Sequence, residues 1–294
     1  MIRKFNKIKD YQRHLILLAG LVSIWFIWAM QFTDTLDVIK SYLHYVMLGI
    51  TGAIFANSTG AGGGVIFIPV FNSLELSHSQ SVSTSFAIQC FGMTAGSIAW
   101  WRHFKQAEFK QSAQLLPILV GLCAPVSIMG IWCAELLSIS APASLELSFS
   151  LFSIILGIAI VYSGLRPQKQ HSTRSLTPLE VSHLIILSFV GGLITAWLSV
   201  GVGEILVIYL ILSRFSPTLA VAVGVMVTAI TVWSVSPIHL NPSSDAYFNI
   251  VLFAGPGAIL GGILAKKLAL YLPVRSLKLF FAFWIIISGI HMYP

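Results

Sequence analysis

Long apolar runs separated by short polar connections fill almost the whole chain, and their lengths predict helices that cross a membrane. A helix needs about 20 apolar residues to span the hydrocarbon core. We expect such helices at Leu15–Phe32, Val82–Trp101, Ala113–Leu137, Leu145–Leu165, Thr218–Val235, Tyr247–Leu268 and Leu277–His291. The pattern therefore predicts an all-α integral membrane protein.

Two further apolar regions are interrupted by glycine-rich polar stretches, NSTGAGGG (Asn57–Gly64) and SVGVGE (199–204). The second arm that follows each interruption is too short to cross a membrane comfortably. Each region is therefore expected to be a helical hairpin, re-entrant or fully crossing, or a broken helix. Their arms are Tyr42–Ala56 with Gly62–Asn72, and Val181–Leu198 with Gly203–Leu212.

The charges predict which way the chain is threaded. If each hairpin returns to the side from which it enters, every lysine and arginine except Lys40 falls on one face. By the positive-inside bias, that face is cytoplasmic, so the N-terminus is cytoplasmic and the C-terminus periplasmic. The opposite face receives Asp34, Asp37, Glu75, Glu146 and Asp245.

This threading makes the two halves inverted repeats, because the first hairpin enters from outside and the second from inside. Thr59–Phe71 (TGAGGGVIFIPVF) can be laid over Val200–Leu212 (VGVGEILVIYLIL), and Ser81–Phe86 (SVSTSF) over Ala220–Val225 (AVAVGV). In each repeat three transmembrane helices follow the hairpin. The expected segments are a basic N-terminus with the first transmembrane helix (1–40), repeat 1 (41–165), a cytoplasmic linker (166–180) and repeat 2 (181–294).

The paired interruptions are the candidate functional site. Inverted repeats with broken helices are typical of secondary transporters, whose binding sites lie at the repeat interface near the bilayer midplane. Each interruption precedes a helix start, where free N–H groups and the helix dipole favour an anion. No lysine or arginine lies well inside an apolar segment, so backbone N–H groups and polar side chains must hold the anion. The candidates are Asn57, Ser58, Thr59, Gly60, Gly62, Gly63, Gly64, Thr84, Ser85, Gln89, Ser199, Gly201 and Gly203.

Glu204 is the only acidic residue deep within a predicted membrane segment. Acids at that depth are costly and are candidates for a functional role. Glu204 could couple transport to protons or gate the substrate, or its carboxylate could cap the second hairpin by accepting hydrogen bonds from Gly201 and the N–H groups that follow. The sequence is compatible with both roles.

Composition narrows the function classes. The chain is 56% hydrophobic and 9% charged, and the positive-inside bias accounts for its net charge of +7, so no nucleic-acid partner is expected. No metal cluster, cofactor motif or nucleophile with its base is readable, so the chain is not expected to be an enzyme. The basic start and first apolar run are interpreted as a retained anchor helix, Cys90, Cys123 and Cys133 as packing residues, and His78 and His239 as interface residues.

The chain resembles the sulfite exporter TauE/SafE family, also called the toluene sulfonate uptake permease family. The resemblance rests on a GxGGGxxxxP element formed by Gly60, Gly62, Gly63, Gly64 and Pro69, on the helix start Ser81–Phe86, and on a degenerate copy of both in the second half. It implies a multi-pass permease of the bacterial inner membrane for sulfite, thiosulfate, sulfoacetate or similar anions. In the second copy Glu204 replaces the middle glycine and Leu210 replaces the proline.

Taken together, these features predict a secondary transporter of small anions that works by alternating access. An anion channel is the nearest alternative, and a sulfur-relay or sensor protein that uses Cys90 and Cys123 is another. No ATP-binding motif is readable. Proton or sodium coupling, a homo-oligomeric state and the direction of transport stay open.

Overall fold

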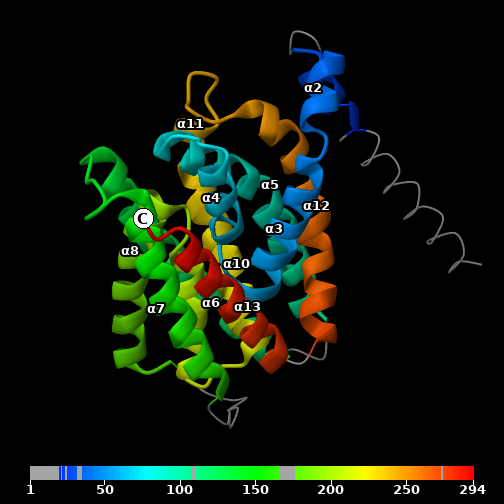
Figure 1. Cartoon of the computed structure of the whole chain (residues 1–294). Helices are drawn as coiled ribbons and strands as arrows, with labels where there is room; N and C mark the ends of the chain where they lie inside the picture. The colour runs from blue at the N-terminus through cyan, green and yellow to red at the C-terminus, as the bar shows by residue number, and fades with distance from the viewer. Residues whose placement is uncertain are drawn as a thin grey trace, which may run out of the picture. The chain divides into compact units, whose positions relative to one another are not determined.

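The computed structural model describes residues 20, 22–23, 25–31, 35–106, 110–165, 176–272 and 274–294 (Figure 1). Of helix residues 35, 110–113, 163–165, 274–275 and 277–278 only the backbone is described. Throughout the described part the regular structure is helical, which confirms the all-α prediction. Contacts divide the chain into two units, Met1–His44 and Tyr45–Pro294.

The first unit contains a short helix that was not predicted, α2 (Thr35–Tyr42). Asp37 lies in its first turn and Lys40 in its last, where each charge complements the helix dipole. The expected first transmembrane helix, Leu15–Phe32, is described at residues 20, 22–23 and 25–31. Of these, residues 20, 22–23 and 25–29 are helical.

The second unit holds both hairpins and the long helices, with bounds close to those predicted. The first half comprises α3 (Tyr45–Thr59), α4 (Gly64–Ser73), α5 (His78–Phe104), α6 (Lys110–Leu136) and α7 (Leu145–Leu165). The second half comprises α8 (Pro178–Leu198), α9 (Val202–Leu212), α10 (Pro217–Ser234), α11 (Ser236–His239), α12 (Phe248–Tyr271) and α13 (Val274–His291). Only α11, a single turn, had no predicted counterpart in this unit.

Side-chain caps set where several helices begin. Ser77 caps α5 in a reciprocal arrangement with Gln80, and Thr177 caps α8 in the same way with Glu180. Ser216 caps α10. Proline occupies the first turn of α8 and α10, where its missing N–H has no partner to lose.

The helices of the two halves pack in a reciprocal pattern. If the halves are matched in order, α3 corresponds to α8, α4 to α9, α5 to α10, α6 to α12, and α7 to α13. The contact of α3 with α12 then corresponds to that of α8 with α6, and the contact of α4 with α13 to that of α9 with α7. The pairs α5 with α10 and α7 with α13 each correspond to themselves. This is the pattern that a two-fold axis between the halves would produce.

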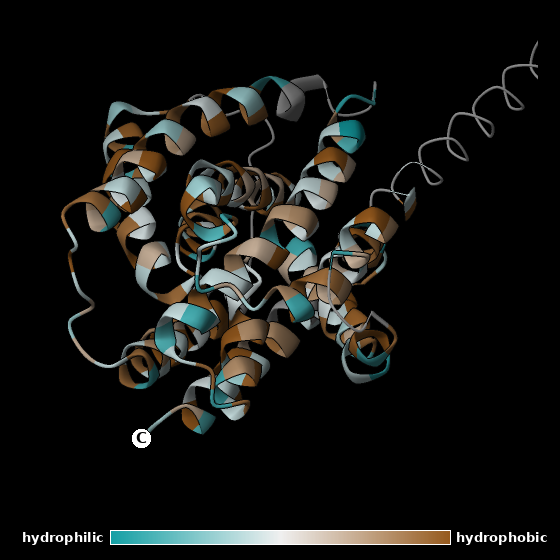
Figure 2. Cartoon of the chain, turned by 90° about the horizontal axis from the view of Figure 1, so that it is seen from above, coloured by the Kyte–Doolittle hydropathy of each residue, from teal (hydrophilic) through white to brown (hydrophobic). Residues whose placement is uncertain are grey.

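The outward faces of the second unit are apolar. Large hydrophobic side chains are exposed along α6, α7, α12 and α13, for example Met129 (64%), Ile155 (67%) and Phe283 (63%). Figure 2 shows long hydrophobic stretches in the helices around the periphery, interspersed with more polar residues. Within the described residues, five helices are long and apolar enough to cross a membrane. The chain is therefore a multi-pass membrane protein.

The helix α5 is an exception that marks the interior. Its 27 residues exceed the spanning length, yet it is not among those five helices. It carries a run of buried residues from Ser81 to Cys90, including five serine, threonine or glutamine side chains. Such side chains are tolerated at membrane depth where protein surrounds them. α5 is thus a central helix whose polar residues face other helices.

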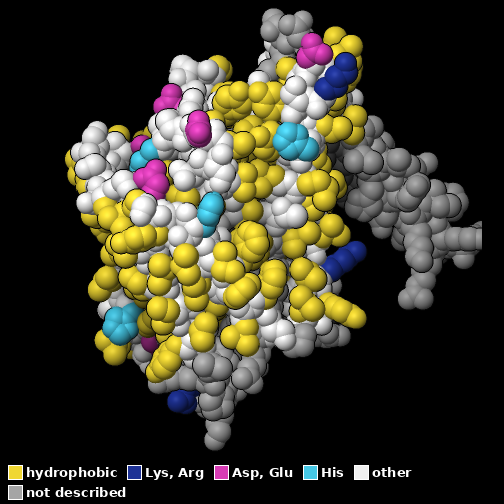
Figure 3. Space-filling model, viewed as in Figure 1, with side chains coloured by type: hydrophobic (Ala, Val, Ile, Leu, Met, Phe, Trp, Pro, Cys, Tyr) yellow, Lys and Arg dark blue, Asp and Glu magenta, His cyan; other side chains and the backbone are white. Residues whose placement is uncertain are grey.

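Charged side chains differ between the two ends of this unit. Arg102, Lys105, Arg214, Lys266 and Lys267 lie where α5, α9 and α12 end, which we call the basic end. The opposite end, where α4 ends and α11 lies, carries Glu75 and Asp245 and is called the acidic end. On the face shown in Figure 3, most acidic side chains of the second unit gather towards the acidic end.

Candidate functional site

Two non-helical breaks, residues 60–63 between α3 and α4 and residues 199–201 between α8 and α9, form the centre of the candidate site. Gly60 (φ 82°) and Gly201 (φ 154°) adopt backbone angles that favour glycine. Ser199, in the left-handed region at φ 57°, ends α8. The chain thus turns sharply at each break and starts a new short helix.

The two breaks lie in direct contact, although about 140 residues separate them in the sequence. A Cβ atom added at Gly203 would lie 2.5 Å from the carbonyl oxygen of Gly60 and 2.5 Å from Thr228 Oγ1. One added at Gly224 would lie 2.6 Å from the same Gly60 oxygen, and one at Gly64 would clash with the carbonyl of Ser199. Glycine at these positions lets the two backbones approach each other.

The Glu204 carboxylate bridges the two breaks. One oxygen accepts a hydrogen bond from the N–H of Gly62 at 2.7 Å, and the other accepts one from the N–H of Gly201 at 2.8 Å. Glu204 is only 2% exposed. The expected cap on its own helix is present, and the bond to Gly62 in the other half is an addition that the sequence did not predict. An anionic group therefore already sits at the start of both short helices.

A second bridge is made by the Gln89 amide from α5. Its oxygen accepts from the N–H of Gly63 at 2.9 Å, and its nitrogen donates to the carbonyl and hydroxyl oxygens of Ser199 at 3.0 and 2.8 Å. Ser85 lies one turn before Gln89 and accepts from both its amide and the Ser199 hydroxyl. We call the residues of these two bridges the central cluster: Gly62, Gly63, Ser85, Gln89, Ser199, Gly201 and Glu204.

Four of the remaining candidates lie around the central cluster in different ways. Ser58 and Thr59 line a cavity next to Glu204. Asn57 instead turns towards α5, and its amide nitrogen donates to the carbonyl of Ala53 in its own helix and to that of Gly92 in α5. Thr84 accepts a hydrogen bond from the N–H of Tyr247 at the start of α12. The structure thus brings Ser58 and Thr59 near Glu204 and gives Asn57 and Thr84 partners elsewhere.

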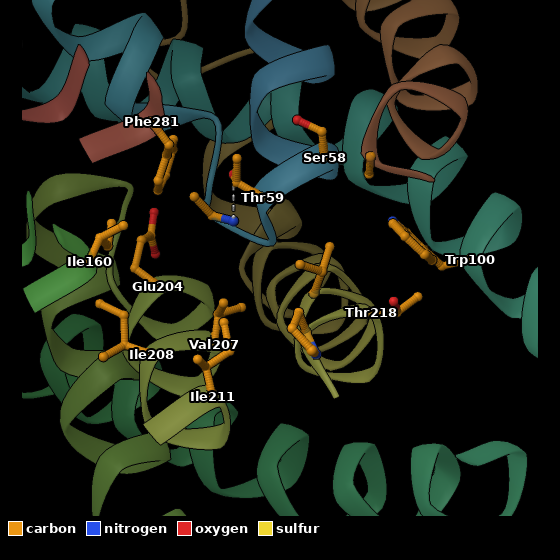
Figure 4. A pocket seen from close by; sticks show the side chains of 14 residues that line it. Ser58, Thr59, Trp100, Ile160, Glu204, Val207, Ile208, Ile211, Thr218 and Phe281 are labelled. Carbon is orange, nitrogen blue, oxygen red and sulfur yellow. Dashed lines mark hydrogen bonds between the residues drawn. The ribbon is translucent and has the colours of Figure 1, made fainter. Parts of the chain in front are cut away.

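A narrow cavity of about 50 Å³ approaches the central cluster from the basic end. In Figure 4, Glu204 and Thr59 lie on one side of it, with Trp100 and Thr218 on another. Most of the other side chains around it are apolar, including Val207 and Phe281. One water molecule needs about 10–15 Å³ of cavity volume measured in this way, so this cavity has room for about three to five waters.

A larger cavity of about 510 Å³ lies at the acidic end. His78, Ser79 and Val82 from the start of α5 contribute to its wall, together with Trp197, which lies two residues before Ser199. The two cavities therefore flank the central cluster, one towards each end of the bundle.

Three residues of the site were not singled out from the sequence. Thr195 Oγ1 accepts from the N–H of Val202 at 3.0 Å and so caps α9. The indole of Trp100 donates to the carbonyl of Asn57 at the end of α3. Thr228 is buried against Gly203, and no described residue hydrogen-bonds its hydroxyl. The only sequence signal for them was a polar or aromatic side chain inside an apolar run.

Comparison with known proteins assigns the family. No curated protein and no solved structure matches the chain. A family model described as sulfite exporter TauE/SafE matches residues 45–292, which include both breaks and every helix that lines the two cavities. The resemblance seen in the glycine element is confirmed, and the chain belongs to the TauE/SafE family of sulfite exporters.

Proposed function

We propose that this protein is a secondary transporter that carries small sulfur-containing anions across the bacterial inner membrane by alternating access. In this proposal the substrate passes through the central cluster, and the cavities at the two ends of the bundle open in turn. The basic end faces the cytoplasm, as the positive-inside bias predicts. The family supports the class of transported anion.

The observation that carries the proposal is the bridging carboxylate of Glu204. Its two oxygens take hydrogen bonds from Gly62 and Gly201, one on each break. A sulfite or sulfonate group also presents negatively charged oxygens that need N–H or O–H donors. The N–H groups at the starts of α4 and α9 can therefore hold an oxyanion at the place that the carboxylate now fills.

The binding groups suit a transporter because they hold an anion without a fixed positive charge. Among the described residues, no lysine or arginine side chain is buried. Neutral donors from Gly62, Gly63 and Ser199 would bind a sulfur oxyanion less strongly than a buried guanidinium would. Moderate affinity allows the anion to be released on the far side.

The two cavities support the inverted-repeat arrangement. Pro217, Thr218 and Val221 line the basic-end cavity, while His78, Ser79 and Val82 line the acidic-end cavity. These two sets occupy equivalent positions when Ala220–Val225 is laid over Ser81–Phe86. Equivalent residues that line cavities at opposite ends are what an inverted repeat with one site between its halves requires.

In this account Glu204 is the gate of the central cluster. An arriving oxyanion and the Glu204 carboxylate compete for the N–H of Gly62, so binding must displace the carboxylate from one break. Loss of that bridge leaves the two breaks joined only by the Gln89 amide and by backbone packing, and so favours a shift of the two halves. When the anion leaves, the carboxylate returns and closes the cluster.

Purified protein in lipid vesicles tests this function. Radiolabelled sulfite or thiosulfate should enter with a saturable rate, and unlabelled anion on the far side should accelerate the flux. Chloride and taurine serve as comparison solutes. Flux that rises linearly with concentration and shows no such acceleration would indicate an anion channel instead.

A further inference from the structure

A buried histidine in the acidic-end cavity lies outside the central cluster. His239 lies in α11, is 7% exposed, and its Nδ1 is 2.9 Å from Ser83 Oγ. Its ring packs on Phe86 with 4.6 Å between ring centroids. No described residue accepts or donates a hydrogen bond at the other ring nitrogen, Nε2. A buried polar nitrogen without a hydrogen-bond partner costs free energy, and such an atom indicates a binding site.

The nearest charged group to this free nitrogen is an acid. Glu135 Oε1, near the end of α6, lies 3.6 Å from His239 Nε2, slightly beyond hydrogen-bonding distance. Both side chains line the acidic-end cavity. A proton on Nε2 would convert this contact into an ion pair with a charge-assisted hydrogen bond. The geometry therefore allows one proton to be shared between the two side chains.

Ser83 positions the ring in either protonation state. A serine hydroxyl can donate to an unprotonated Nδ1 or accept from a protonated one. The 2.9 Å contact can thus persist while the other nitrogen gains or loses its proton. Ser83 is a positioning residue in this arrangement and does not need to titrate.

The other titratable groups nearby already have partners. His78 lines the same cavity from the start of α5, with its Nε2 2.9 Å from the carbonyl oxygen of Trp197. Asp245, in the connection after α11, hydrogen-bonds the hydroxyl of Ser79. Glu135 is thus the charged group that faces His239 directly. Without a bound proton the pair carries a negative charge, which repels an anion in the cavity, and with one proton it is neutral.

A single face of α5 connects this cavity with the central cluster. His78 and Val82 line the cavity, and Ser85 and Gln89 belong to the cluster. Their spacing of four, three and four residues places all of them on one stripe of the helix. An anion that leaves the cluster along this stripe enters the cavity where Glu135 and His239 lie.

The repeat-equivalent position of His239 in the other half holds a side chain that does not titrate. In the register that lays Ala220–Val225 over Ser81–Phe86, His239 corresponds to Trp100, which lines the basic-end cavity. The indole of tryptophan does not take up a proton near neutral pH. The histidine of the acidic-end cavity therefore has no counterpart at its repeat-equivalent position in the basic-end cavity.

We propose that Glu135 and His239 form a proton-binding site in the acidic-end cavity, and that the proton bound there accompanies the anion through this cavity. The second part rests on the proposed function, whereas the proton site itself does not. Protonation removes the negative charge that an anion would otherwise meet. Anion flux through this end should then increase when the solution on that side is acidified.

The proton site can be tested without transport, by infrared difference spectra of the purified full-length protein between acidic and alkaline pH. We expect an imidazolium signal that is lost in His239→Gln, and that changes together with a carboxylate signal lost in Glu135→Gln. His183→Gln is the matched control and should keep both signals, because His183 is exposed, lines neither of the two cavities and has its Nδ1 3.1 Å from the Tyr209 hydroxyl. Identical spectra for wild type and His239→Gln, or an imidazolium signal unaffected by Glu135→Gln, would overturn the proposal.

Thiosulfate flux into vesicles tests the coupling. Thiosulfate stays fully ionised near neutral pH, whereas sulfite itself takes up a proton there, so thiosulfate isolates the protonation of the protein. Acidification at the acidic end should raise wild-type flux several-fold, and His239→Gln and Glu135→Gln should lose this increase while His183→Gln keeps it. The same increase in His239→Gln would refute the coupling. If neither thiosulfate nor sulfite is carried by the wild type, the proposed function fails and the infrared result alone decides the proton site.

Discussion

At the scale of single residues, the Glu204 carboxylate connects the two halves of the protein. It accepts backbone hydrogen bonds from Gly62 in one half and Gly201 in the other, in an environment where it is 2% exposed. Each bond joins a charged acceptor to an N–H at a helix start, which makes both bonds stronger than neutral ones. Any anion that uses these donors must displace the carboxylate.

Replacement of this residue measures that competition. In Glu204→Gln the amide is neutral and offers one acceptor oxygen, so it competes poorly for the two N–H groups. Thiosulfate should bind about tenfold more tightly, which corresponds to about 1.4 kcal/mol, while counterflow slows because the bridge no longer re-forms fully. Calorimetric titration measures the affinity, and Glu75→Gln, an exposed acid at the acidic end, is the control. Equal affinities for wild type and Glu204→Gln would place the substrate elsewhere.

The N–H of Gly62 can be tested with a small side chain. A Cβ there would lie 3.2 Å from Gln89 Oε1 and 3.5 Å from Glu204 Oε1, so Gly62→Ala fits with small shifts but occupies the space that an oxyanion needs. We expect thiosulfate affinity to fall about tenfold or more, at roughly 1.4 kcal/mol per factor of ten. Gly121→Ala is the matched control, because its Cβ would meet no atom within 4 Å. Unchanged binding in Gly62→Ala would remove this N–H from the site.

The sequence predicted much of this residue-level chemistry and missed its long-range part. Glu204 stood out as an acid within an apolar segment, and a cap on its own helix follows from its position three residues after Gly201. Its bond to Gly62 depends on how the two halves pack, which no local pattern encodes. For the same reason Asn57 and Thr84, polar residues close to the glycine motif or the cluster in sequence, could not be assigned their actual partners in advance.

At the scale of the helices, glycines in and beside the breaks serve close packing, in addition to their proposed role in letting an anion approach the backbone. Gly203, Gly224 and Gly60 bring α9, α10 and the first break into backbone contact. Gly64 does the same for α4 and Ser199. Small residues at helix contacts are the usual means of association in membranes, where lipid provides little hydrophobic drive between helices. Gly64, Gly203 and Gly224 are thus needed for packing, whereas the N–H of Gly62 belongs to the proposed binding site.

This distinction predicts a stability effect at Gly203. In Gly203→Ala the new Cβ would meet the Gly60 oxygen and Thr228 Oγ1, so the breaks must separate. The free energy of unfolding should fall by about 1–3 kcal/mol, the usual cost of overpacking. Thermal unfolding in detergent measures the loss, with Gly121→Ala as the control of equal chemistry. An unchanged melting temperature would show that the breaks are not held in contact.

Helix positions were predicted well because apolar run length fixes them, and the caps at Ser77, Thr177 and Ser216 mark three of the starts. The single turn α11 was missed because four residues leave no periodic signal. Its position matters, since it carries His239 into the acidic-end cavity. The sequence alone suggested only an interface residue there.

At the scale of the whole membrane unit, the proposed mechanism opens the two cavities in turn. Thr218 lines the basic-end cavity and Ser79 the acidic-end cavity, at equivalent positions of the proposed repeats. In alternating access only one of the two should be open to solution at a time. The accessibility of Thr218 and Ser79 therefore reports which of the two cavities is open.

Cysteine labelling at these two positions tests the alternation. Thr218→Cys and Ser79→Cys are each introduced after Cys90, Cys123 and Cys133 have been replaced by alanine. A thiosulfate gradient that speeds labelling at one position by several-fold should slow it at the other, because a single movement closes one cavity as it opens the other. Labelling rates that rise together would instead indicate a continuous pore.

Counterflow of sulfite through the purified protein tests the central claim most directly, namely that one site between the two halves is exposed to each side in turn. Vesicles loaded with unlabelled sulfite should accumulate labelled sulfite transiently, with a rate that saturates as external sulfite rises. A flux that is linear in concentration and indifferent to the internal anion would contradict the account.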